Sequence, residues 1–177
     1  KKDEKLGQIY VSTTFFILFL ITIVIFLLFV FIHPYLNWSG ILNVDPVKVS
    51  NLNEVILFSF GFFCISFVLK VTGIVYMSHQ KPAVNDLMTM AGSLLSLILL
   101  IVLVKTTEGS VMKAAVTFSA APVVVLLIAY FISFYGPLSK FRPRMSMVNF
   151  HYAKDLMNLG VQFFILQISG LFIFSTS

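Results

Sequence analysis

Lys70 is the one charged side chain within residues 63–77 (FCISFVLKVTGIVYM), a stretch that is otherwise apolar or weakly polar. A lysine at the centre of a membrane helix costs on the order of 2.5–3.5 kcal/mol, and less near an end, where the ammonium reaches the interface. Lys70 lies seven residues before Met77, about 10 Å along a helix axis at ~1.5 Å per residue. The chemistry that such a cation could perform is the binding of an anionic group.

The small and polar residues around Lys70 recur at helical spacing: Ser59, Ser66 and Gly73. In a helix these residues and Lys70 share a stripe roughly 60° wide. The opposite face carries Cys64, Val68 and Val75. Small and polar residues mark the side of a membrane helix that faces other helices or a cavity. We therefore expect Lys70 to point inward, with Ser66 and Gly73 beside it, and the alternative is a lysine that snorkels to the interface.

The side chains that catalysis requires do not gather in the sequence. The three histidines, His33, His79 and His151, lie in different predicted loops, and Cys64 is the single cysteine. Every Asp and Glu lies at or outside the end of a predicted helix, and there is no phosphate-binding loop or nucleophile elbow. The sequence thus predicts a protein that is not an enzyme and that uses no metal and no cofactor. Any coupling to protons or sodium must use carboxylates elsewhere.

The composition predicts the all-α class of integral membrane proteins. Hydrophobic residues make up 59% of the chain and charged residues 11%, against roughly 45–50% and 25% in soluble domains. Spans of about 20 mostly apolar residues are expected over residues 8–32, 55–77, 87–104 and 114–135. Pro122 interrupts the hydrogen-bond ladder of the fourth. A fifth span begins near Gly160, and the two ends of the chain predict an internal piece of a longer protein.

The loops differ in positive charge, which predicts their orientation. Eight Lys and Arg residues lie before the first span, in the turn between the second and third, and in the loop after the fourth: Lys1, Lys2, Lys5, Lys81, Lys140, Arg142, Arg144 and Lys154. The other two loops hold three: Lys48, Lys105 and Lys113. By the positive-inside rule, the side with eight faces the cytoplasm. The net charge of +5 therefore points to membrane orientation and not to nucleic acid.

The loop after the fourth span contains an amphipathic pattern in residues 149–160. One helical face would carry Phe150, Ala153, Leu156, Met157 and Gly160, and the other Lys154, Asp155 and Asn158. This predicts a short interfacial helix, or else an extension of the fifth span into the headgroups. The basic residues of the loop are predicted to contact the membrane surface: Lys140, Arg142, Arg144 and Lys154.

Three segments in order resemble one family. QKPAVNDLMTMAGSLLSLILLIVL (residues 80–103) resembles the turn from the fourth to the fifth helix of polysaccharide flippases. These are the Wzx-type O-antigen and capsule transporters of the MOP (multidrug/oligosaccharidyl-lipid/polysaccharide) exporter superfamily. SMVNFHYAKDLMNLGVQFFILQISGLFIFSTS (residues 146–177) resembles their passage from helix six to seven, and KLGQIYVSTTFFILFL (residues 5–20) is similar to the start of their third helix. The resemblance covers essentially the whole chain.

The resemblance implies a fragment of a two-bundle transporter in the bacterial inner membrane. Residues 1–135 would belong to the N-terminal bundle as helices three to six, residues 136–159 would be the cytoplasmic link, and residues 160–177 would begin the C-terminal bundle. The implied function is the flipping of an undecaprenyl-pyrophosphate-linked oligosaccharide for surface polysaccharide biosynthesis, with Lys70, Ser66 and Gly73 at the substrate. The implied partners are that lipid-linked oligosaccharide, membrane lipids and other polysaccharide-assembly proteins, without nucleic acid.

Other function classes stay open at this point. One is another exporter of the superfamily that carries a drug or a lipid precursor. A membrane polymerase or ligase acting on the same lipid carrier would need a large basic or acidic outer loop, whereas residues 33–54 hold only Lys48 as Lys or Arg. The third class is a channel or a non-transporting scaffold; a channel would need a repeated filter segment, and none is visible.

Overall fold

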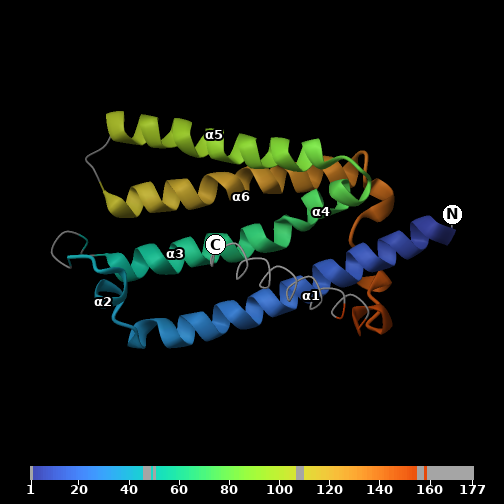
Figure 1. The fold of residues 1–177 in the computed structure, drawn as a ribbon, viewed down its shortest axis with the longest axis horizontal. Coiled ribbons are helices and arrows are strands. Elements are labelled where there is room, and N and C mark those ends of the chain that lie inside the picture. The colour runs from blue at the N-terminus through green and yellow to red at the C-terminus, as the bar shows by residue number, and fades with distance from the viewer. Residues whose placement is uncertain (1, 46–48, 50, 107–109, 155–157, 159–177) are drawn as a thin grey trace, which may run out of the picture. The chain divides into compact units, whose positions relative to one another are not determined.

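The apolar runs of the sequence form helices, because in a bilayer each segment must satisfy its own backbone N–H and C=O groups. A computed structural model describes residues 2–45, 49, 51–106, 110–154 and 158. The long helices are α1 (Lys2–Ile32), α3 (Leu52–Leu69), α4 (Val71–Ser78), α5 (Pro82–Thr106) and α6 (Val111–Tyr135). The short ones are η1 (His33–Tyr35), α2 (Trp38–Leu42), η2 (Ser139–Phe141) and η3 (Met145–Met147) (Figure 1). All regular structure in these residues is helical.

Four helical stretches are long and apolar enough to cross a membrane: Asp3–Tyr35, Leu52–Ser78, Pro82–Thr106 and Val111–Tyr135. The prediction that this region is all-α, with four helical stretches of spanning length, is therefore confirmed, and these stretches fit a multi-pass membrane protein. Residues 151–154 are helical. Asn149 and Phe150, at the start of the expected interfacial helix, are described and are not helical, and residue 158 is helical. Residues 155–157 and 159–160 of that helix lie outside the described residues, and so does the fifth span expected from Gly160.

The first two spans differ in detail from the expectation. α1 begins at Lys2, six residues before the predicted start, and Asp3 and Glu4 lie in its first turn, where carboxylates stabilise the positive end of the helix dipole. The second span is not one helix over residues 55–77, because Lys70 separates α3 from α4.

Large apolar side chains are exposed in this structure and small polar ones are buried, which is the reverse of the arrangement in a soluble protein. Large apolar side chains such as Leu27, Phe31 and Val104 are 61%, 71% and 77% exposed. The side chains with the least exposure include small hydroxyl residues: Ser12, Thr13, Thr72, Ser96 and Ser133. Helices in lipid associate through small and hydrogen-bonding residues, because lipid tails already solvate the large apolar ones. The pattern is that of a protein whose outer surface contacts acyl chains.

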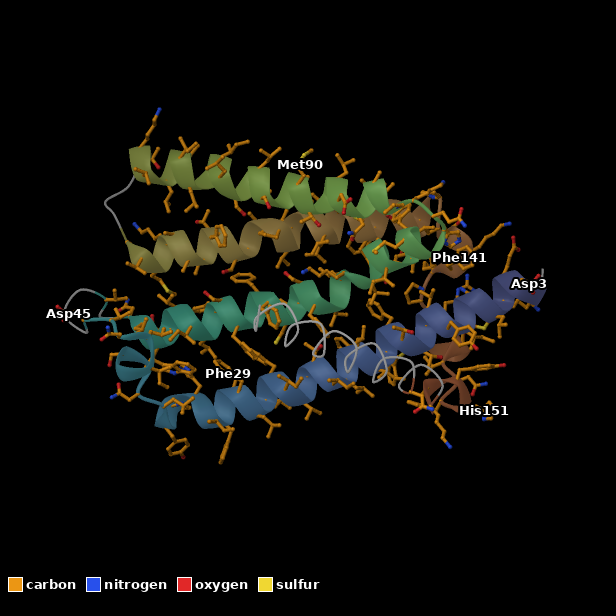
Figure 2. The ribbon with its side chains drawn as sticks, viewed as in Figure 1. Asp3, Phe29, Asp45, Met90, Phe141 and His151 are labelled. Atoms are coloured by element: carbon orange, nitrogen blue, oxygen red, sulfur yellow. The ribbon has the colours of Figure 1, made fainter. Side chains whose placement is uncertain are left out.

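The chain divides into two compact units, residues 1–17 with 140–177 and residues 18–139. Within the second unit, α3 packs on α6 through Leu69, Val123 and Leu126, with Phe62 and Tyr130 against them. At the end of α1, Phe29 stacks on Phe60 with ring centroids 4.0 Å apart (Figure 2). The Trp38 indole N–H donates to His33 Nδ1 at 2.9 Å. Aromatic contacts thus hold the second half of α1 to α3.

α5 and α6 pack closely where α6 contains Pro122. A Cβ at Gly92 would lie 3.2 Å from the Cα of Pro122, so a side chain at this position would push α5 and α6 apart by a few tenths of an ångström. Pro122 has no N–H to donate to the carbonyl of Phe118, four residues earlier. The Ser96 hydroxyl lies 3.3 Å from that carbonyl oxygen and 3.0 Å from that of Gly92. The single hydroxyl proton of Ser96 is therefore shared between the Gly92 carbonyl of α5 and the Phe118 carbonyl that Pro122 leaves without its helical donor, and α6 continues to Tyr135.

Candidate functional site

Lys70 occupies the interruption of the second span. Its backbone is still right-handed, with φ −59° and ψ −16°, although ψ is less negative than the roughly −42° of a regular helix. Its N–H donates to the Ser66 carbonyl at 3.0 Å, and its carbonyl accepts from the N–H of Ile74 at 3.2 Å. The backbone thus stays hydrogen-bonded while the chain changes direction between α3 and α4 (Figure 1).

The interruption lies where the second span gains a further packing partner. Leu69, just before Lys70, belongs to the cluster with α6. Gly73, three residues after it, lies against α5, where a Cβ would collide with the side chain of Asn85. After the interruption the second span therefore gains a contact with α5, while α4 keeps a contact with α6 through Tyr76 and Ser133.

The Lys70 side chain is exposed, whereas its neighbours Leu69 and Val71 are 7% and 2% exposed. Lys70 forms no ion pair with any residue that the structure describes. A charged ammonium within a membrane span requires water, a headgroup or an anion beside it. Lys70 is therefore a free cationic group on a rigid, well-packed backbone.

The other two predicted site residues have different surroundings. Ser66 is half-buried and Gly73 is buried, so the structure brings Gly73 to α5 and leaves Lys70 outward. The opposite face is also buried, at Cys64, Val68 and Val75. Burial among the described residues therefore does not single out the Ser66–Lys70–Gly73 stripe as the inward face. The sequence predicts that these three residues share one stripe, but it does not predict which neighbouring helix covers each face of the second span.

A buried polar cluster that the sequence did not indicate lies next to Lys70, on α4 and α6. The Tyr76 hydroxyl donates to Ser133 Oγ at 3.1 Å in a buried contact. The Thr72 side chain is fully buried, and its hydroxyl has no hydrogen-bond partner in the described part of the chain. Serine and threonine are common in membrane spans, so their types alone do not identify such a cluster. The described residues contain no group of three His, Cys, Asp or Glu side chains that could hold a metal.

The predicted surface residues lie in residues 140–154, which we call the strap. Within the first unit the strap lies along the first half of α1. Lys140 Nζ contacts Glu4 Oε1 at 2.6 Å. Gln8 Nε2 donates to the Arg142 carbonyl at 3.0 Å, and the Arg144 N–H donates to Ser12 Oγ at 3.1 Å. Lys154 is exposed.

Further contacts fix the second half of the strap. The Asn149 N–H donates to Thr13 Oγ1 at 3.0 Å. Tyr152 packs edge-on against Tyr10 with centroids 5.0 Å apart, and Phe150 against Phe16 at 6.2 Å. Figure 2 labels Phe141 and His151 on the strap. The anchoring side chains Gln8, Ser12 and Thr13 were not identified from the sequence, although their spacing of four and one places them on one side of a helix.

Neither the protein-family models, nor the curated proteins, nor the solved structures contain a match to this chain.

Proposed function

We propose that the chain is part of a MOP-type transporter of the bacterial inner membrane that flips a lipid-linked oligosaccharide. The supporting observation is Lys70, an exposed cation without a protein partner in the described residues, at an interruption of an apolar span. Transporters often place their binding sites where a spanning helix is broken. The resemblance of residues 5–20, 80–103 and 146–177 to polysaccharide flippases adds the substrate class.

The proposed role of Lys70 is to hold the pyrophosphate, or another acidic group, of the lipid-linked sugar during its passage. An ammonium is a compact point charge without the fixed fork of a guanidinium. It therefore attracts a phosphate without imposing one orientation, which suits a ligand that must be released on the other side. The buried neighbours Leu69 and Val71 keep the position of the charge constant while the headgroup moves.

The test is export by Lys70 variants in cells that lack their own copy of the protein. Lys70→Arg retains the charge and should keep partial export. Lys70→Ala and Lys70→Gln should lose export while the protein still inserts, because removing a cation from a span lowers the insertion cost by up to about 3 kcal/mol. The measurements are surface glycan and the amount of protein in the membrane.

Lys105→Gln is the matched control. Lys105 is also exposed and lies in the last turn of α5, so its loss should leave export unchanged. Wild-type export by Lys70→Ala at an equal protein level would show that Lys70 only snorkels. Loss of export in both variants would show a general sensitivity to charge and not a site.

A further inference from the structure

The strap exposes basic and large apolar side chains together. Residues 140–154 contain four Lys and Arg residues and no Asp or Glu. Arg144, His151 and Lys154 are exposed, as are Met145 and Phe150 at 76% and 60%. Cationic groups beside exposed apolar groups are typical of segments that lie in the membrane–water interface.

From residue 140 to residue 150 the contacts of the strap advance along α1, and Tyr152 then packs back against Tyr10. In order, the paired residues are Lys140 with Glu4, Arg142 with Gln8, Arg144 with Ser12, and Phe150 with Phe16. Each part of the strap therefore has a defined height on α1. Ser12 bonds to the backbone of Arg144 and not to its side chain, and the Arg144 side chain is exposed.

The heights on α1 can be converted into depths in the membrane. The apolar run of α1 begins at Phe15. At ~1.5 Å per residue, Ser12 lies about 4.5 Å before it, Gln8 about 10 Å and Glu4 about 16 Å. The headgroup layer of one leaflet is roughly 5–8 Å thick. On this scale the backbone of Arg144 is at the height of the phosphate layer, Lys140 is beyond it, and Phe150 is beside the start of the apolar run.

We propose that the strap is a binding surface for anionic phospholipids, with Arg144 as its main headgroup contact. A guanidinium presents a planar fork of donors that matches a phosphate. Ser12 positions Arg144 by accepting its backbone N–H, and Phe150 lies among the first acyl methylenes. This role concerns the lipid that surrounds the protein and does not depend on what the protein transports.

The depth of the strap favours a lipid over a soluble anionic partner. A soluble partner would engage the outermost charge, but Lys140 is already paired with Glu4. The backbone of Arg144 lies at the height of Ser12, and its side chain is exposed. The exposed ring of Phe150 beside Phe16 also fits acyl chains better than a hydrophilic ligand.

The test measures lipid selectivity of the full chain in nanodiscs that contain spin-labelled phosphatidylglycerol or phosphatidylcholine. The fraction of motionally restricted label gives the association constant of one lipid relative to the other. Wild-type protein should prefer phosphatidylglycerol, and the preference should weaken with salt. Arg144→Gln should reduce the relative constant about fivefold, the effect of one basic residue near the surface.

Three further variants separate the proposal from a general charge effect. Lys140→Gln, which removes an equal charge further out, should reduce the constant by less than about twofold. Ser12→Ala should reduce it as well, although no charge is lost, and Arg144→Lys should retain most of it. Equal losses in Arg144→Gln and Lys140→Gln, or no loss in either, would overturn the assignment. If Arg144→Gln does not change the lipid selectivity, the strap does not bind anionic lipid through Arg144, and a soluble acidic partner is the alternative.

Discussion

The bond from Ser96 to the Phe118 carbonyl predicts how α6 tolerates Pro122. Ser96→Ala removes the donor and leaves a carbonyl in an apolar contact without its helical partner. Hydrogen bonds between membrane helices contribute about 0.6 kcal/mol on average and up to about 1.7, and an orphaned buried carbonyl adds a desolvation cost. We expect Ser96→Ala to lower the free energy of unfolding by about 1–2 kcal/mol.

A second substitution tests the reason for this loss. Pro122→Ala restores an N–H that can donate to the Phe118 carbonyl along α6. In that background Ser96→Ala should cost less, and the coupling between the two substitutions should be about 0.5–1 kcal/mol. The assay is reversible unfolding in mixed micelles with increasing dodecyl sulfate, carried out on the four proteins of the double-mutant cycle.

Ser93→Ala is the control in the same helix. Ser93 is exposed, and its hydroxyl donates to the Thr89 carbonyl of its own helix at 3.1 Å. Its replacement should change the stability by less than about 0.5 kcal/mol. The reasoning is refuted if Ser96→Ala costs no more than Ser93→Ala, or if it costs the same with and without Pro122.

Two further predictions concern packing and orientation. Gly92→Ala should destabilise the protein by about 1–2 kcal/mol in the same unfolding assay, because the new Cβ meets the backbone Cα of Pro122, which cannot rotate away; Gly61→Ala, where the new Cβ would lie 3.6 Å from its nearest neighbour, should be neutral or slightly stabilising. In a Cys64→Ser background, a cysteine at Lys81 should not react with an impermeant thiol reagent in intact cells, whereas one at Asn37 should; the reverse pattern would contradict the orientation derived from the loop charges.

The sequence determined the class and the spans of this protein, because both depend on local composition. A run such as residues 15–32 is apolar whatever surrounds it, and only a helix can satisfy its backbone in lipid. The cation in the second span could also be identified in this way, since Lys70 differs in kind from the residues beside it. The loop charges predicted that the start of the chain and the strap lie on the same side of the membrane. The position of the strap beside the start of α1 in the structure agrees with this prediction.

The tertiary structure decided what these residues contact. No Gly or Pro lies at residues 69–72, so the local sequence does not predict the interruption at Lys70. The interruption lies between Leu69, which packs on α6, and Gly73, which packs against α5. The strap is similar, since Arg144 and Ser12 are 132 residues apart and their spacing carries no information about their bond. Local patterns report which side chains are apolar, charged or small, whereas the pairing of distant segments depends on the shapes and hydrogen-bonding groups of both partners at once.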